Sequence, residues 1–168
     1  MLPPPQVLGL TLVPGSLQEI ESLESVILKL PQAKYRLRTF HAPGVYLREI
    51  WMPRGAFIIG HEHRTEHFNI VAKGAALVVV NGHVERMQAP YCLVSCVGVR
   101  KILLILEDMV WYTVHPNPQN IRDEDVLEEM MIVKSRTWLD HEVCKAERLL
   151  QKLDHVLPDF SQPSQLQP

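Results

Sequence analysis

The feature that most constrains the fold is a series of short apolar runs, separated by turn-forming residues, between Val45 and Val114. These runs are rich in β-branched and aromatic side chains, which favour strands. Asn81-Gly82 supplies the two positive φ angles of a type I′ turn and so predicts a hairpin. About eight short strands indicate a sandwich, jelly roll or barrel rather than βαβ units. Breaks between strands are predicted at Pro53-Arg54-Gly55, Lys73-Gly74, Asn81-Gly82, Ala89-Pro90, Val97-Gly98 and Glu107-Asp108.

Helices are predicted on both sides of this β region. Before it, Ser16 and Glu19 form a capping-box pattern, and apolar residues recur at helical spacing as far as Pro31. After it, a helix is predicted over 123–134. At 168 residues the chain is near the size of one domain. We divide it into an arm with a short helix (1–40), a β-barrel (41–118), a helical extension (119–158) and a tail rich in Gln, Ser and Pro that is expected to be disordered (159–168).

The helical extension carries an amphipathic seam of apolar residues, namely Leu139, Val143, Ala146, Leu150, Leu153 and Leu157. The seam covers under three heptads, so we expect it to pack against the chain's own barrel, with a partner helix as the alternative. We also expect a homo-oligomer, formed through a sheet edge or through this C-terminal helix.

Charge and hydropathy exclude two classes of partner. The 17 basic and 19 acidic residues give a net charge of −2 without a block of like charge, which is not the pattern of a nucleic-acid binder. No apolar run approaches the roughly 18 residues that span a bilayer, and the Pro-rich start does not resemble a signal peptide. We therefore expect no nucleic acid, no membrane and a cytoplasmic location.

Three histidines lie within seven residues, at His61, His63 and His67. On a strand, His61 and His63 point to the same face, and four further residues of bent strand bring His67 alongside. Three neutral imidazole nitrogens suit Fe, Ni, Zn or Cu better than Mg or Ca. The pattern predicts a three-histidine site for a divalent transition metal, and its alternative is a set of hydrogen-bonded interior histidines without metal.

The segment around these histidines resembles the first motif of the cupin superfamily, in which a glycine, a His-x-His pair, a glutamate and a second glycine follow at set spacing. Gly55, His61, His63 and Gly74 match it in type and spacing, whereas His67 stands where cupins have glutamate. The resemblance implies a cupin-type jelly-roll β-barrel with the metal inside. A shift of one residue that turned Glu66 inward would restore the carboxylate, but the spacing of the family favours His67.

The second cupin motif is matched only in part. Gly98 aligns with its glycine, but Lys101 stands where the resemblance implies a fourth metal-binding histidine. A protonated lysine repels a cation, so it could serve only if burial made it neutral. Beyond the superfamily, residues 40–132 resemble small cupin-like proteins encoded by bacteriophages, a family without a settled activity. That likeness implies a host-cytoplasmic or virion protein.

Several other residues are candidates for the cavity or for support of the metal ligands. Glu62 and Glu66 alternate with the histidines, so each is either a solvated side chain or an acceptor that orients an imidazole. Lys101 either lines the barrel mouth, where it would bind an anion, or pairs with Glu107 or Asp108 at the surface. His115 shares a strand face with Trp111, and it either enters the cavity as a further ligand or base or is structural.

Three functions fit these observations. The first is a metal-dependent cupin that binds or acts on a small molecule. The second is an inert jelly-roll module for structure or oligomerisation in a phage particle or at a phage-host interface. The third is a sensor or sponge that uses the cavity and Lys101 to bind an anionic metabolite without turnover.

Overall fold

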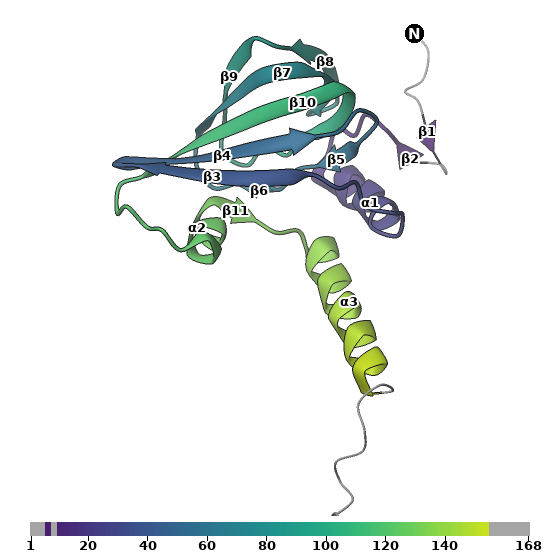
Figure 1. Cartoon of the computed structure of the whole chain (residues 1–168). Helices are drawn as coiled ribbons and strands as arrows, with labels where there is room; N and C mark the ends of the chain where they lie inside the picture. Colours follow the sequence, from purple (N-terminus) through teal and green to yellow (C-terminus); the bar gives the residue numbers. More distant parts are fainter. Residues whose placement is uncertain (1–5, 8–9, 155–168) are drawn as a thin grey trace, which may run out of the picture.

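The computed structural model describes residues 6–7 and 10–154, which form an antiparallel β-barrel flanked by helices (Figure 1). The helices are α1 (Leu17–Ile27), α2 (Glu124–Met131) and α3 (Arg136–Asp154). The strands are β1 (Gln6–Val7), β2 (Leu10–Thr11), β3 (Arg36–Ala42), β4 (Gly44–Met52), β5 (Phe57–Ile59), β6 (Glu62–His63), β7 (His67–Val80), β8 (His83–Gln88), β9 (Tyr91–Ser95), β10 (Ile102–Asn117) and β11 (Ile132–Val133).

Two long strands, β7 and β10, hold the barrel together. They pair with each other, and the main sheet runs in the order β3-β4-β10-β7-β8. Each long strand also has different neighbours along its length: β10 pairs with β5 at one end and β4 at the other, and β7 pairs with β9 and then β8. This exchange of neighbours closes the sheet as in a jelly roll. The prediction of a mostly β, jelly-roll barrel with an N-terminal helix and C-terminal helices is confirmed.

The prediction of turns at Lys73-Gly74 and Glu107-Asp108 is wrong, because both pairs lie inside the long strands. The β7–β10 register shifts beside Glu107 and again beside Lys73, so these residues form irregularities of the ladder instead of chain reversals. Gly74 has a φ of 80°, and a Cβ built on it would lie 2.4 Å from the backbone oxygen of Asp108. Turn-type residues therefore mark a close crossing of two backbones here.

We expect Gly74→Ala to destabilise the fold more than Gly44→Ala. Both glycines have a positive φ, so both variants share the cost of a left-handed L-residue, about 1–2 kcal/mol. Nothing lies within 4 Å of a Cβ at Gly44, in contrast to the backbone contact at Gly74. Overpacking costs about 1–3 kcal/mol, and urea denaturation should show this excess for Gly74→Ala. Equal free energies of unfolding would contradict the close crossing.

The predicted hairpin and the predicted N-terminal helix are both confirmed. Asn81 and Gly82 have φ angles of 48° and 77° between β7 and β8, as a type I′ turn requires. Ser16 and Glu19 form the reciprocal hydrogen bonds of a capping box at the start of α1. This helix buries Ile20 and Leu23 against β7 and β10, so it closes one end of the barrel.

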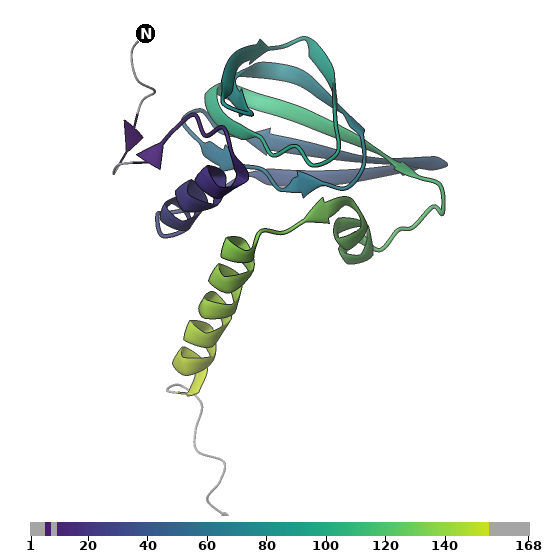
Figure 2. The same cartoon turned by 180° about the vertical axis from the view of Figure 1, so that it is seen from behind.

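The C-terminal helices differ in how they pack. The helix predicted over 123–134 is present as α2, with Asp123 as its N-cap, and its last residues give way to β11, which pairs with β6. Helix α3 instead extends away from the barrel (Figures 1 and 2). The expectation that the seam packs on the barrel is wrong, because Leu139, Val143 and Leu150 are 44, 59 and 60% exposed. The side chains of Leu153 and Leu157, and the tail at 159–168, lie outside the described residues.

No helix among residues 6–7 and 10–154 combines the length and the apolar character that a bilayer crossing requires.

Candidate metal centre and adjoining cavity

The structure brings three histidines together from three elements: His63 ends β6, His67 begins β7, and His115 lies near the end of β10. One ring nitrogen of each lies within 4.8 Å of the others. The ring centroids are 4.0 Å apart for His63 and His67, 4.6 Å for His67 and His115, and 5.1 Å for His63 and His115. Three imidazoles at these separations can converge on a single ion.

The surroundings of the cluster keep its imidazoles neutral. Burial, together with the neighbouring histidines, lowers the pKa of His63 to about 2 and that of His115 to about 3. Burial also lowers the pKa of His67. Neutral imidazole is the form that binds metal, so protons do not compete for these nitrogens at neutral pH.

Ring nitrogens of the cluster are available to a ligand. His67 Nδ1 lies 3.0 Å from the carbonyl oxygen of Thr65, which can only accept, so Nδ1 carries the proton and Nε2 keeps its lone pair. That Nε2, His63 Nδ1 and both ring nitrogens of His115 are buried without a hydrogen-bond partner among the described residues. Orphaned buried nitrogens are costly unless something binds them. The donor set fits Zn, Fe, Ni or Cu.

His61 lies outside this cluster. Strand β6 begins at Glu62, so the alternation that would align His61 with His63 does not reach it. Its ring instead meets the edge of Trp138 on α3, with centroids 5.3 Å apart. The structure thus groups His63 and His67 with His115, and it places His61 on the cavity wall.

Neither of the two glutamates belongs to the cluster formed by the three histidines. Glu66 is exposed while His67 is 3% exposed, so the inward position belongs to the histidine. Glu62 is half-buried on β6, beside Gly98. Neither carboxylate hydrogen-bonds to a histidine within the described part of the chain, so a role in orienting an imidazole stays a prediction.

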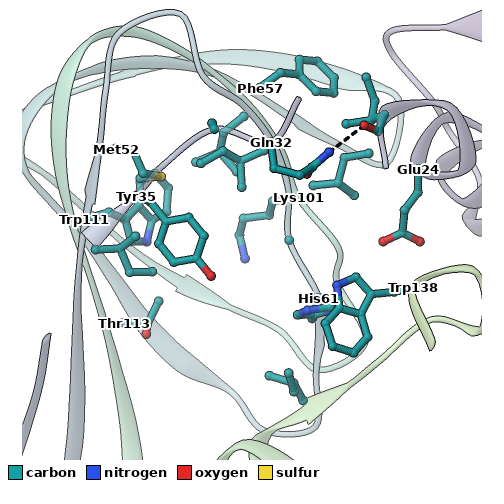
Figure 3. Close-up of a pocket in the computed structure, with 18 of the residues that line it drawn as sticks. Glu24, Gln32, Tyr35, Met52, Phe57, His61, Lys101, Trp111, Thr113 and Trp138 are labelled. Carbon is teal, nitrogen blue, oxygen red and sulfur yellow. Dashed lines mark hydrogen bonds between the residues drawn. The ribbon is translucent and has the colours of Figure 1, made fainter. Parts of the chain in front are cut away.

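Lys101 is buried beside the cluster, and the alternative of a surface pair with Glu107 or Asp108 is wrong. Its ammonium group donates a hydrogen bond to Ser95, and Ser95 pairs across the strands with His67. Asp108 instead accepts from the backbone N–H of Arg54. Burial lowers the pKa of Lys101 to about 8. Figure 3 shows its amine pointing into the cavity.

A cavity of about 300 Å³ adjoins the histidine cluster. Successive cross-strand rows of its wall change from polar to apolar side chains. In the row nearest the histidines, Arg48 on β4 pairs with Thr113 on β10, which pairs with Asn69 on β7. In the next row Trp111 lies between Ile50 and Val71. Trp111 and Thr113 both face the cavity in Figure 3.

Sequence reasoning placed Thr113 on the strand face of Trp111 and His115 but missed Arg48 and Asn69 as cavity residues. A signal for Arg48 existed, because it alternates with the apolar Tyr46 and Ile50 and so belongs to the inward face of its strand. Thr113 alternates in the same way with Trp111 and His115, and Asn69 with His67 and Val71, but only cross-strand register shows that the three polar residues form one row.

A buried ion pair connects the elements at the rim of the cavity. Arg100 Nη2 lies 2.7 Å from Glu24 Oε1, and each side chain is 4% exposed. Arg100 also donates to the carbonyl oxygen of Gly60, and Glu24 accepts from the hydroxyl group of Ser135, which caps α3 at Trp138. The pair therefore ties α1 and the start of α3 to the mouth of the barrel.

Comparisons with known proteins find similarity among solved structures, whereas no family model and no curated sequence matches this chain. KdgF from Halomonas sp. is 19% identical, with a TM-score of 0.45, over 57% of this chain and 86% of that one. An RmlC-like cupin from Shewanella frigidimarina is 16% identical, with a TM-score of 0.45, over 54% and 80%. Salicylate 1,2-dioxygenase from Pseudaminobacter salicylatoxidans is 15% identical, with a TM-score of 0.49, over 67% and 35%. The jelly-roll architecture of this chain rests on its own strand pairing.

Proposed function

We propose that this protein binds a divalent transition metal through His63, His67 and His115 and binds or acts on a small molecule in the adjoining cavity. The observation that carries the proposal is the convergence of three buried, neutral imidazoles, each with at least one buried ring nitrogen that has no partner among the described residues. Protein interiors rarely leave such groups unsatisfied. A bound ion would take one nitrogen from each of the three rings.

Three protein ligands leave coordination positions open, so the metal would supply Lewis-acid chemistry to a molecule in the cavity. The chain's own residues would bind and orient that molecule. The polar row of Arg48, Thr113 and Asn69 would face one end of it, and the row that contains Trp111 would face the other. Lys101 hydrogen-bonds to Ser95, on the strand beside His67, and contributes positive charge at this site.

The proposal is tested by elemental analysis of protein purified without an affinity tag. We expect about one equivalent of Zn, Fe, Ni or Cu per chain, and we expect EDTA-treated protein to regain a metal on titration. Added Zn should also raise the melting temperature, because a ligand that binds only the native state stabilises it. Metal-free protein whose melting temperature does not respond to Zn, Fe, Ni or Cu would refute the metal site.

A second candidate function, an inert module for structure or oligomerisation, is favoured by the apolar seam that α3 leaves exposed. On this proposal Leu139, Val143 and Leu150 pack against a second copy and form the expected homo-oligomer. Light scattering at micromolar concentration tests it, with Leu150→Lys as the variant that should dissociate the assembly. The resemblance to phage-encoded proteins supports a place in the host cytoplasm or the virion, and mass spectrometry of purified particles would tell these two apart.

A further inference from the structure

We propose that the cavity binds a small organic carboxylate with an apolar body, whose carboxylate group lies at Arg48 and whose body lies along Ile50 and Trp111. This inference rests on the proposed function, because the histidine cluster adjoins the same end of the cavity. It adds the chemical class of the ligand and the residues that recognise it.

Arg48 supplies a positive charge that no carboxylate among the described residues contacts directly. The residue is half-buried, it lines the cavity, and it forms no hydrogen bond or ion pair within the described ranges. The acidic groups nearby form their ion pairs with other residues: Glu24 pairs with Arg100 at 2.7 Å, and Glu128 pairs with Lys134 at 2.9 Å. Glu128 interacts with Arg48 only electrostatically, without an ion pair. A half-buried guanidinium without a partner is costly, and its planar fork matches a carboxylate.

The groups in the same cross-strand row as Arg48 also offer hydrogen-bond donors to the cavity. Asn69 Oδ1 already accepts from Trp111 Nε1 at 2.9 Å, which leaves the Asn69 amide nitrogen as a buried donor without a partner. The Thr113 hydroxyl group, paired in register with both Arg48 and Asn69, is also buried and unpartnered. A guanidinium, an amide N–H and a hydroxyl group together complement an acceptor that carries negative charge.

The opposite part of the cavity excludes a ligand that is polar throughout. Ile50, Met52, Leu103 and Trp111 line it, and they belong to the barrel core or pack against it. At about 300 Å³ the cavity is at the small end for ligand sites. A short aliphatic or aromatic body therefore fits better than a sugar or a nucleotide.

The inference is tested by calorimetric titration of the full chain, in Zn-loaded and EDTA-treated form, with hexanoate and with hexanol. We expect hexanoate to bind, and we expect Arg48→Gln to weaken its affinity about 10- to 100-fold, which is the range for a hydrogen bond to a charged group. The affinity for hexanol should change less than 2-fold in that variant. Thr113→Val, which keeps the side-chain volume, should also weaken hexanoate alone. Arg86→Gln, which removes an exposed arginine on β8 outside the cavity, should leave both ligands unchanged.

Other results would overturn the inference. Hexanoate could bind with equal affinity to wild type, Arg48→Gln and Thr113→Val, with each protein shown to be folded by circular dichroism. That result would show that the polar row does not bind the carboxylate. Hexylphosphonate that binds more than 10-fold tighter than hexanoate would remove the carboxylate class. Metal content separates this failure from that of the metal site: protein that holds Zn but binds no hexanoate contradicts the inference alone. Protein that binds hexanoate through Arg48 but holds no metal contradicts the metal site alone.

Discussion

Replacing His115 with alanine is expected to abolish tight metal binding, whereas replacing His61 is expected to leave it intact. His115 is 1% exposed, and both its ring nitrogens lie buried without a partner beside His63 and His67. Loss of a partner that merely orients a ligand lowers metal affinity about 10- to 100-fold, so loss of a direct ligand should exceed 100-fold. His61→Ala removes an imidazole from the same cavity without touching the cluster, which makes it the matched control.

The measurement is Zn affinity by competition with a chelating dye, together with melting temperature. At a Zn concentration 100 times its Kd, the unfolding free energy of the wild type should rise by about 2.7 kcal/mol. Its melting temperature should rise by roughly 5–10 °C. His61→Ala should show the same shift and His115→Ala none. If His61→Ala loses the metal while His115→Ala keeps it, the site follows the spacing of the sequence motif, and the cluster seen in the structure is not the metal centre.

Replacing Glu24 with alanine is expected to cost about 3–5 kcal/mol of unfolding free energy, because it leaves the Arg100 guanidinium buried without its counter-ion. The same change removes the acceptor of the Ser135 hydroxyl group, so α3 should also lose contact with α1. Urea denaturation gives the energetic effect, and hydrogen exchange at the start of α3 gives the local one.

The control for this prediction is Glu142→Ala, which breaks an exposed ion pair with Lys145 on α3. Exposed pairs contribute about 1 kcal/mol or less, so this variant should remain close to wild type. The double variant Glu24→Leu/Arg100→Met tests the cause, because replacing a buried pair by apolar groups is often nearly neutral. A Glu24→Ala protein as stable as Glu142→Ala would show that the pair is not buried in solution.

Some of the histidine positions could be predicted from the sequence, and others could not. The preference for His67 over Glu66 follows from the spacing of the motif that the sequence resembles, and the structure buries His67 while exposing Glu66. The pairing of His61 with His63 fails because β6 is only two residues long, so alternation does not extend back to His61. His115 lies 48 residues after His67 in the sequence, and only the pairing of β10 with β7 brings the two strands together.

The sequence by itself determined the local features, because these depend on neighbours within a few residues. The capping box of Ser16 and Glu19, the turn at Asn81-Gly82 and the β class of the chain are of this kind. Tertiary structure alone decided the grouping of His63, His67 and His115, the polar row at Arg48 and the exposed seam of α3. Each depends on which strands pair, in which register, and on which surface is left uncovered, and these are set by packing between residues distant in the chain.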